Sequence, residues 1–480
     1  MNRTATYLTL AGGLALLAIV LGLPQKPAVT EHPTPPEPIP VKVTVTPDPV
    51  KPIPVNQDGS LTMSAKLSHP YITSGMSDVF VNVDLTAVTV NGAERAPVNL
   101  ALVIDRSGSM AGEKLQHAKQ AARHLVHELN ENDRLSIVHY GSDVKALQSL
   151  FATAENKERM LRYIDQIWDD GGTNISQGLS VGQRAIDVAK SDFRVNRIIL
   201  ISDGQPTEGM TSTTSLSNLA RTIRTNGITV SSLGVGTDFN EDLMQRIAEL
   251  GSGSYGFMRD ASQLAAIFQK DLQQAGTTVA RNVELTFELP DGVRLSEVMG
   301  YSFTQAGRSV RVILPDFSAG QRETLVARLN VSAPASGSFD VTALKLNYSD
   351  LLKNSAIESS AQLAAMVTQK REEVVQHANK DVVLLGARAE SAMNAMKAAD
   401  AMKRGDYGGA QGLLEQNAAI YDEAEEIAGK GSAADDRVQN NGYISQVQSA
   451  PMAAPEEQQA RAKSLKVGAL RQAGRGASLY

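Results

Sequence analysis

The sequence predicts an α/β fold in which a doubly wound parallel sheet is inserted into an antiparallel β-sandwich and followed by a C-terminal helical region. Between residues 97 and 276, apolar strand-like runs alternate with helix-like segments, which is typical of a parallel sheet covered by helices. On both sides of this interval, apolar and polar residues alternate as they do in half-buried strands. Beyond residue 351 the composition favours helices.

Length and composition are those of a globular protein with more than one domain. A chain of 480 residues exceeds one ordinary hydrophobic core, so two or three domains are expected. Its hydrophobic content of 42% and charged content of 20% are ordinary. A net charge of −6 is small for this length and argues against a general nucleic-acid binder. The absence of cysteine excludes disulfides, thiolate nucleophiles and zinc–sulfur sites.

Residues 1–23 predict a signal peptide or an N-terminal membrane anchor. Residues 5–23 form an uncharged, mostly apolar run that approaches the length needed to span a bilayer, and Pro24 closes it. Without cysteine, a lipoprotein anchor is excluded. Both alternatives, cleaved or retained, place the rest of the chain outside the cytoplasm. We expect a location on the periplasmic side of the inner membrane or secretion.

A proline-rich linker and a divided β-sandwich follow. The many prolines of residues 24–57 favour an extended, stiff spacer. Residues 58–96 and 277–350 are expected to form one sandwich, because two strands cannot stand alone. The expected strands are 60–67, 78–90, 282–289, 293–299, 309–314, 323–332 and 338–348.

The inserted segment, residues 97–276, is expected to hold the doubly wound sheet. Its expected strands are 99–104, 134–140, 197–201, 229–235 and 254–257. Its expected helices are 113–130, 154–168, 175–190, 213–226, 241–250 and 261–274.

The C-terminal part is expected to be helical and then disordered. Residues 351–429 form the predicted helical region, with helical composition from residue 356 and a helical hairpin that turns at residues 405–408. A plain helical bundle and a tetratricopeptide-like hairpin are both compatible with this pattern. Residues 430–480 are rich in Gln, Ala and Gly and are predicted to be a disordered tail.

Oxygen-bearing side chains follow the ends of expected strands. The apolar run 100–104 ends in Asp105, with Ser107 and Ser109 directly behind it. Thr173 lies in a glycine-rich loop ahead of a helix, and Asp203 follows the strand 197–201. Parallel strands bring such loops to one edge of the sheet, where open α/β sheets place their ligands. Hydroxyl and carboxylate oxygens suit a small hard cation, so a magnesium-type site is predicted there.

Residues 97–276 resemble the von Willebrand factor A domain, a Rossmann-like fold, and the three loops look like its metal-ion-dependent adhesion site. The resemblance rests on the metal positions and on the surrounding sequence motifs, which are Gly-Thr-Asn-Ile at 172–175, Ser-Asp-Gly-Gln-Pro-Thr at 202–207 and Gly-Val-Gly at 234–236. The flanking strands resemble the arrangement in inter-alpha-trypsin heavy-chain-like and chloride-channel-regulator-like bacterial proteins.

The resemblance implies roles for Asp105, Ser107, Ser109, Thr173 and Asp203. The two serines would bind the ion through their hydroxyls, and the threonine directly or through water. The two aspartates would act mostly through bound waters. Mg²⁺ is the expected ion, with Ca²⁺ or Mn²⁺ as alternatives. A shell of neutral oxygens leaves a dication attractive to an outside carboxylate, so a protein partner would supply Asp or Glu.

The sequence therefore favours a membrane-tethered, extracytoplasmic adhesion or scaffold module over an enzyme. No phosphate-binding loop, nucleophile elbow or set of carboxylates for a second metal is present. A structural cell-envelope scaffold with a fold-stabilising metal is the first alternative, and a metal-dependent hydrolase is the second. Neither the partner nor the oligomeric state follows from the sequence.

Other candidates have plainer interpretations. His117, His124 and His127 fall opposite the apolar face of the expected helix 113–130 and are expected to be solvated. His139 lies in an expected core strand and is interpreted as a buried histidine. Trp168 is the single tryptophan and is expected in the core.

Overall fold

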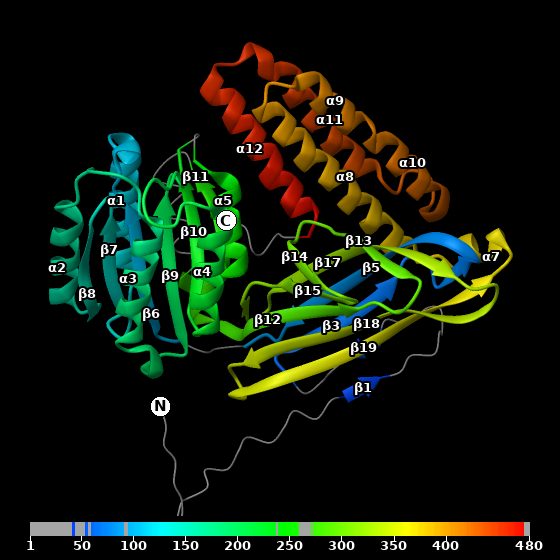
Figure 1. Ribbon diagram of the computed structural model, residues 1–480, viewed down its shortest axis with the longest axis horizontal. Coiled ribbons are helices and arrows are strands. Elements are labelled where there is room, and N and C mark those ends of the chain that lie inside the picture. Colours follow the sequence, from blue (N-terminus) through cyan, green and yellow to red (C-terminus); the bar gives the residue numbers. More distant parts are fainter. Residues whose placement is uncertain are drawn as a thin grey trace, which may run out of the picture. The chain divides into compact units, whose positions relative to one another are not determined.

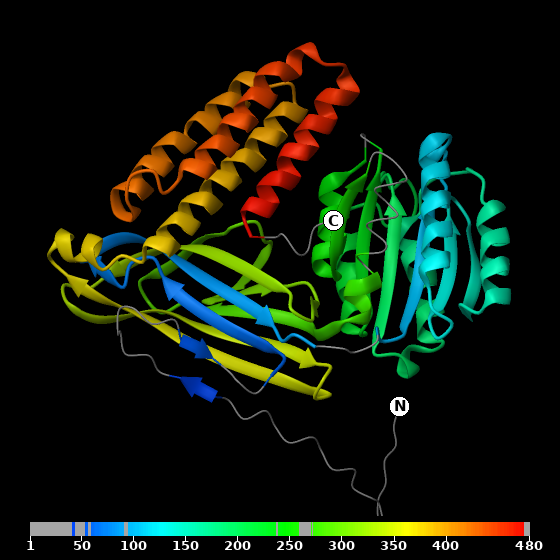
Figure 2. The same cartoon turned by 180° about the vertical axis from the view of Figure 1, so that it is seen from behind.

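The computed structural model describes residues 41–43, 53–55, 59–90, 95–236, 239–258, 270 and 272–474. The apolar segment 1–23, most of the linker 24–57 and most of the expected helix 261–274 lie outside the described residues. Within the described part, no helix has the length and apolar character needed to cross a membrane. The described elements form three sheets and a group of C-terminal helices (Figures 1 and 2).

The inserted segment contains a six-stranded sheet with the strand order β11-β10-β9-β6-β7-β8. Neighbouring strands are parallel except for the edge strand β8, which pairs antiparallel with β7 and was not predicted. The pattern of β8 is weak because most of its side chains are exposed or half-buried. The strands are β6 (Val98–Asp105), β7 (Arg134–Tyr140), β8 (Val144–Phe151), β9 (Val195–Ser202), β10 (Thr229–Val235) and β11 (Ser252–Met258).

Helices cover both faces of this sheet, so the predicted doubly wound architecture is confirmed (Figure 1). In the central strand β6, Leu102 belongs to the apolar core on the face covered by α1 and α2, whereas Val103 belongs to the core on the face covered by α3, α4 and α5. This alternation explains why β6 is buried along its whole length. The helices are α1 (Glu113–Glu128), α2 (Ala154–Asp165), α3 (Ile175–Asp187), α4 (Thr213–Thr225) and α5 (Glu241–Leu250).

The β-sandwich consists of strands from both sides of the insert. β5 (Gly75–Ala87), which precedes the insert, pairs antiparallel with β17 (Arg322–Ala333), which follows it. The five-stranded sheet has the order β13-β17-β5-β3-β2, and its further strands are β2 (Ile53–Val55), β3 (Leu61–Leu67) and β13 (Val293–Val298). Apolar side chains of both sheets, among them Leu85 and Phe287, form one core.

The facing sheet is eight-stranded and includes a strand where a helix was expected. Its strands are β1 (Val41–Val43), β4 (Tyr71–Thr73), β12 (Thr278–Glu288), β14 (Phe303–Ala306), β15 (Ser309–Ile313), β16 (Phe317–Ser318), β18 (Gly337–Asp350) and β19 (Ser355–Thr368). The prediction of helix from residue 356 is therefore wrong. The alanines of β19 suggested a helix, but its side chains alternate between core and surface and the strand pairs with β18 over nearly its full length.

The prediction of a disordered tail over residues 430–480 is also wrong for its described part. Residues 434–449 and 455–472 are helical, and Leu465 and Ala469 pack against Ala395 and Ala399 of α8. Small side chains allow this close helix packing, which composition alone does not reveal. The helices are α7 (Arg371–Gln376), α8 (Lys380–Lys403), α9 (Tyr407–Glu415), α10 (Asn417–Ala428), α11 (Ala434–Ser449) and α12 (Pro455–Gln472). The expected turn lies between α8 and α9.

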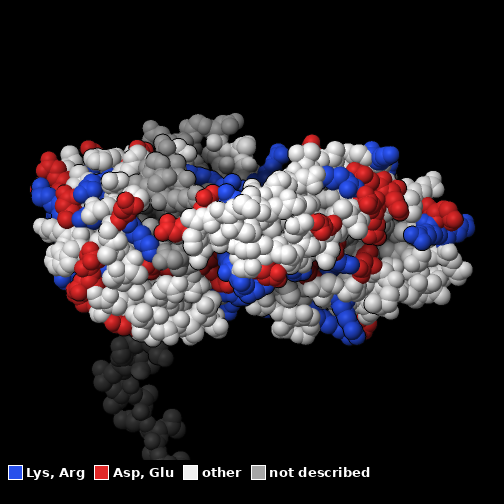
Figure 3. Space-filling view, turned by 90° about the horizontal axis from the view of Figure 1, so that it is seen from above, with Lys and Arg blue, Asp and Glu red and all other residues white. Residues whose placement is uncertain are grey.

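Charged side chains of both signs mingle on the surface. On the face shown in Figure 3, lysine and arginine are interspersed with aspartate and glutamate. Among the described residues on that face, no broad basic area of the kind that binds a nucleic-acid backbone is visible.

Candidate metal site

The predicted site residues lie in loops at the carboxyl edge of the six-stranded sheet. Asp105 is the last residue of β6, and Asp203 directly follows β9. These strands are neighbours, with Ile104 opposite Ile201, so the two aspartates leave the same end of the sheet, with Asp203 one residue further along than Asp105. Thr173 directly precedes Asn174, whose side chain caps the N-terminus of α3.

Asp105 is buried and held on both carboxylate oxygens. Oδ1 accepts the backbone N–H of Ser107 at 2.9 Å, and Oδ2 accepts the hydroxyl of Ser202 at 2.6 Å. Burial raises the pKa of Asp105 to about 6, and the negative charge of Asp203 adds to the rise, while the hydrogen bonds from the two serines oppose it.

The serine and threonine loops are joined by backbone hydrogen bonds. The hydroxyl oxygens of Ser107 and Ser109 lie 3.1 Å apart. Between these serines, the N–H of Gly108 donates to the carbonyl oxygen of Gly171 at 3.1 Å, which connects the loop that carries Thr173. The structure thus places Ser107 beside Ser109 and the glycine-rich loop against both of them.

Thr173 is buried and tied to the chain that follows Asp203. Its N–H donates to the hydroxyl of Thr207 at 2.9 Å, and its carbonyl oxygen accepts the N–H groups of Thr207 and Glu208. All three loops are therefore connected to one another.

Asp203 carries a buried oxygen without a hydrogen bond. Its Oδ2 lies 3.5 Å from the ammonium nitrogen of Lys114. Its Oδ1 has no hydrogen-bond partner among the described residues. An unpaired buried carboxylate oxygen costs free energy, so this position calls for a ligand or an ordered water. Among the described residues, no group of three or more His, Cys, Asp or Glu side chains is placed to hold a metal. The donors gathered here are mainly hydroxyls.

Several supporting residues were missed by the sequence analysis. The hydroxyl of Ser202 donates a hydrogen bond to Asp105. Its position directly before Asp203 is the one sequence feature that could have indicated this role. Arg106 is buried and pairs with Asp143 and Asp170, so it connects the first loop to the chain before Thr173. No short-range sequence pattern predicts the pairing of Arg106 with these two distant aspartates.

The structure also shows where Trp168 and the histidines named in the sequence analysis lie. Trp168, expected in the core, is instead 60% exposed, because the chain leaves α2 at Asp165 and runs over the surface toward Thr173. His139 is buried as expected, and burial lowers its pKa to about 4. The histidines of α1 are half-buried or exposed.

Comparison with known proteins identifies the inserted segment. Residues 99–270 match the von Willebrand factor type A domain. The chain contains a von Willebrand factor type A domain. The uncharacterized protein YfbK of Escherichia coli is 30% identical over 260 residues, which cover 52% of this chain and 45% of YfbK. Inter-alpha-trypsin inhibitor heavy chain H2 of mouse is 32% identical, with 40% of this chain and 21% of that protein covered.

Solved structures show the same fold over most of the chain. A von Willebrand factor type A protein from Catenulispora acidiphila has a TM-score of 0.65 at 17% identity and covers 86% of this chain and 98% of its own. The ArnB paralog VWA2 from Sulfolobus acidocaldarius has a TM-score of 0.55 at 20% identity, with 86% and 99% covered. The matches to YfbK and heavy chain H2 span less than half of those relatives. Type A domains are generally adhesion and protein-interaction modules, and they commonly bind a divalent ion.

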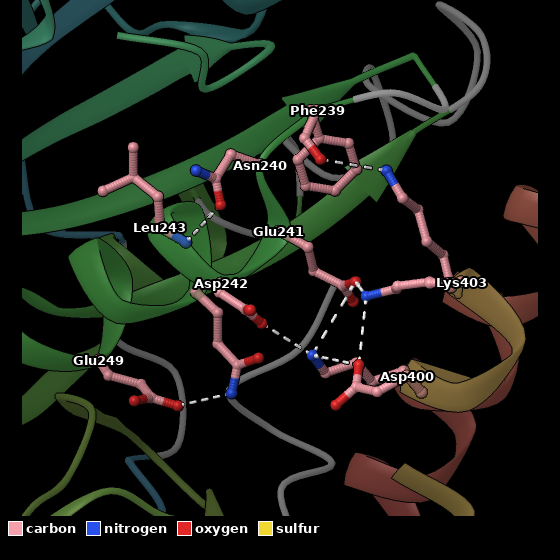
Figure 4. Close-up of polar contacts among 11 residues, drawn as sticks. Phe239, Asn240, Glu241, Asp242, Leu243, Glu249, Asp400 and Lys403 are labelled. Atoms are coloured by element: carbon pink, nitrogen blue, oxygen red, sulfur yellow. Dashed lines mark hydrogen bonds and ion pairs between the residues drawn. The ribbon is translucent and has the colours of Figure 1, made fainter. Parts of the chain in front are cut away.

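The A domain contacts the C-terminal helices through the start of α5 (Figure 4). Glu241 forms an ion pair with Lys403 of α8 and lies 4.0 Å from Lys466 of α12. Lys466 also pairs with Asp242 at 3.0 Å and with Asp400 at 3.5 Å. Burial alone would lower the pKa of Lys466, but these acids raise it to about 12. The start of α5 therefore links the A domain to α8 and α12.

Proposed function

We propose that the chain is an extracytoplasmic, membrane-tethered protein-binding module that recognises an acidic residue of a partner through Mg²⁺. Asp105, Ser107, Ser109, Thr173 and Asp203 would hold the ion. Ca²⁺ or Mn²⁺ could replace it, because the donors are all oxygens.

The observation that carries this proposal is the buried oxygen of Asp203 that has no hydrogen-bond partner among the described residues. Asp203 follows β9, and the neighbouring strand β6 leads into the loop in which the hydroxyls of Ser107 and Ser109 lie 3.1 Å apart. A divalent ion or its bound water would satisfy that oxygen. Asp105 already uses both oxygens in hydrogen bonds to Ser107 and Ser202, so it is poorly placed to neutralise an ion directly. An ion held mainly by neutral hydroxyls keeps a strong attraction for a carboxylate of another protein.

Capture of a partner under controlled metal conditions tests the proposal. The full-length chain is incubated with cell-envelope extract in Mg²⁺ or in excess chelator, and retained proteins are compared. We expect capture only with Mg²⁺, and loss of capture for Asp203→Ala and for Ser107→Ala. Ser191→Ala is the matched control, because Ser191 is an exposed serine whose hydroxyl donates to its neighbour Asp192 and to no other described residue. Equal capture in chelator would contradict the metal-dependent function.

The location is tested separately. The apolar segment 1–23 supports export and tethering. An epitope-tagged chain should sediment with membranes and be cut by protease added to spheroplasts. Complete protection from that protease would contradict the extracytoplasmic location without bearing on the metal site.

A further inference from the structure

Trp168 is an exposed aromatic residue in the loop that leads to Thr173 of the candidate metal site. It is the single tryptophan of the chain and is 60% exposed. An indole offers a large contact area at little cost in side-chain entropy, and tryptophan is the residue type most enriched at binding hot spots. An exposed tryptophan next to a candidate docking point therefore calls for a function.

The loop of Trp168 lies directly against the serine loop. The N–H of Asp170 donates to the carbonyl oxygen of Arg106 at 2.8 Å, and the carbonyl oxygen of Gly171 accepts the N–H of Gly108 at 3.1 Å. The chain from Trp168 to Gly171 spans at most about 10 Å. A protein that buries about 800 Å² here would cover a circle of about 16 Å radius. A partner whose carboxylate reaches the site would therefore also cover Trp168.

The surroundings of the indole favour a cation. The ammonium of Lys145 lies over the ring, 5.3 Å from its centroid, so this ring already takes part in one cation–π contact. Asp143, in the loop between β7 and β8, is exposed, and so are Asp169 and Asp170, which lie in the loop of Trp168.

The local charge is negative. Arg106, which is buried, pairs with Asp143 and Asp170, and Lys145 lies 3.7 Å from Asp143. With Asp169, the carboxylates of these loops outnumber the cations. An additional positive charge from outside would meet both the indole and these carboxylates.

We propose that Trp168 is a specificity-determining contact for a partner segment that places an arginine or lysine two to four residues from the acid bound at the metal. This proposal rests on the proposed function. An extended chain rises about 3.3 Å per residue, so two to four residues span about the same length as the chain from Trp168 to Gly171. A guanidinium can stack on the exposed part of the indole and pair with Asp169 or Asp170.

A peptide array tests this inference with the full-length chain. Each peptide carries a central Asp or Asn, and Arg, Leu, Glu or Gly is placed in turn at each of four positions on either side. Binding is measured in Mg²⁺ and in chelator for the wild type, Trp168→Ala, Trp168→Phe and Val188→Ala. Val188 is the matched control, because it is 73% exposed and follows α3 at the opposite edge of the sheet.

We expect binding that needs both Mg²⁺ and the central Asp, and a gain of about fivefold for Arg at one or more flanking positions. Trp168→Ala should remove that gain, Trp168→Phe should keep part of it, and Val188→Ala should leave it unchanged. Binding of the arginine peptide should also shift the tryptophan emission of the wild type to shorter wavelength.

The contrary outcomes are distinct. An arginine preference that survives in Trp168→Ala, or a preference for Leu or Glu, overturns the role of Trp168 and leaves the metal-dependent function standing. Binding that ignores Mg²⁺ or the central Asp, or an absence of binding by the wild type, contradicts the proposed function and this inference together.

Discussion

The backbone N–H of Asn240 donates to the carbonyl oxygen of Asp203, with the two atoms 3.0 Å apart. The next residue, Glu241, pairs with Lys403 of α8. Lys463 of α12 lies over the ring of Phe239, 3.6 Å from its centroid. The short segment 239–242 therefore lies between a residue of the candidate metal site and the C-terminal helices.

The lysines at this contact should stabilise the fold. Lys466→Met leaves Glu241, Asp242 and Asp400 with less compensating charge, although Lys403 still pairs with Glu241. We expect a loss of about 1–3 kcal/mol in the free energy of unfolding, measured by urea denaturation. Lys397→Met, at an exposed position of the same helix as Lys403, is the control and should change little. Equal effects of the two substitutions would contradict a stabilising contact.

The backbone at Gly204 should couple the metal loop to α5. Gly204 has φ +65°, and an added Cβ would lie 3.1 Å from Met244 and 3.3 Å from the carbonyl oxygen of Asn240. Gly204→Ala should lower stability by more than 1 kcal/mol and weaken Mg²⁺ binding, measured by titration calorimetry. Gly227 has φ +80°, and no atom of the described residues lies within 4 Å of an added Cβ, so Gly227→Ala should cost about 1 kcal/mol and leave Mg²⁺ binding intact.

His139 should make stability depend on pH. Burial is the first cause of its low pKa, and the positive charges of Arg106 and Lys145 add to the shift. Because the folded-state pKa of about 4 lies below the ordinary histidine value of 6.5, protonation of His139 favours the unfolded state. The contribution of His139 to stability is therefore fully present above about pH 6.5 and is lost as pH falls toward about 4. Between pH 7 and 5 the loss contributed by His139 should be about 2 kcal/mol, and the raised pKa of Asp105 acts in the opposite direction over the same range.

Two variants check this assignment. His139→Phe should remove that component of the pH dependence of unfolding, since an apolar ring can still pack beside Tyr163, whose ring centroid lies 5.5 Å away. His127→Phe changes an exposed histidine of α1 and should keep the pH dependence. If both variants retain it equally, another group is responsible.

Magnesium should stabilise the fold only modestly. A docking ion with a dissociation constant of about 1 mM adds roughly 1 kcal/mol at about 5 mM Mg²⁺. Thermal melting should therefore rise by a few degrees, and Asp203→Ala should abolish the rise. A rise of tens of degrees would favour the alternative of a structural scaffold with a fold-stabilising metal.

The site loops could be predicted because their chemistry is local. Asp105, Ser107 and Ser109 follow a continuous apolar strand, and the order of a parallel sheet brings its strand ends together. The α/β fold could be predicted for a similar reason, because its apolar strands and amphipathic helices are visible in short stretches of sequence, and the structure confirms it. The metal itself stays a prediction.

Other features depend on distant partners. The alanine-rich segment of β19 is a strand because it pairs with β18. The small residues of α12 are buried because α12 packs against α8. The exposure of Trp168 follows from the path of a loop that Arg106 holds through Asp170. None of these long-range contacts leaves a periodic signal in the sequence.

The most direct test of the central claim is an anomalous difference map from crystals soaked in Mn²⁺, which can replace Mg²⁺ at oxygen sites. We predict a peak within bonding distance of the hydroxyls of Ser107 and Ser109, with at least one coordination position held by water or by a carboxylate of a neighbouring molecule. A peak elsewhere, or an ion fully enclosed by this chain's own carboxylates, would contradict the account.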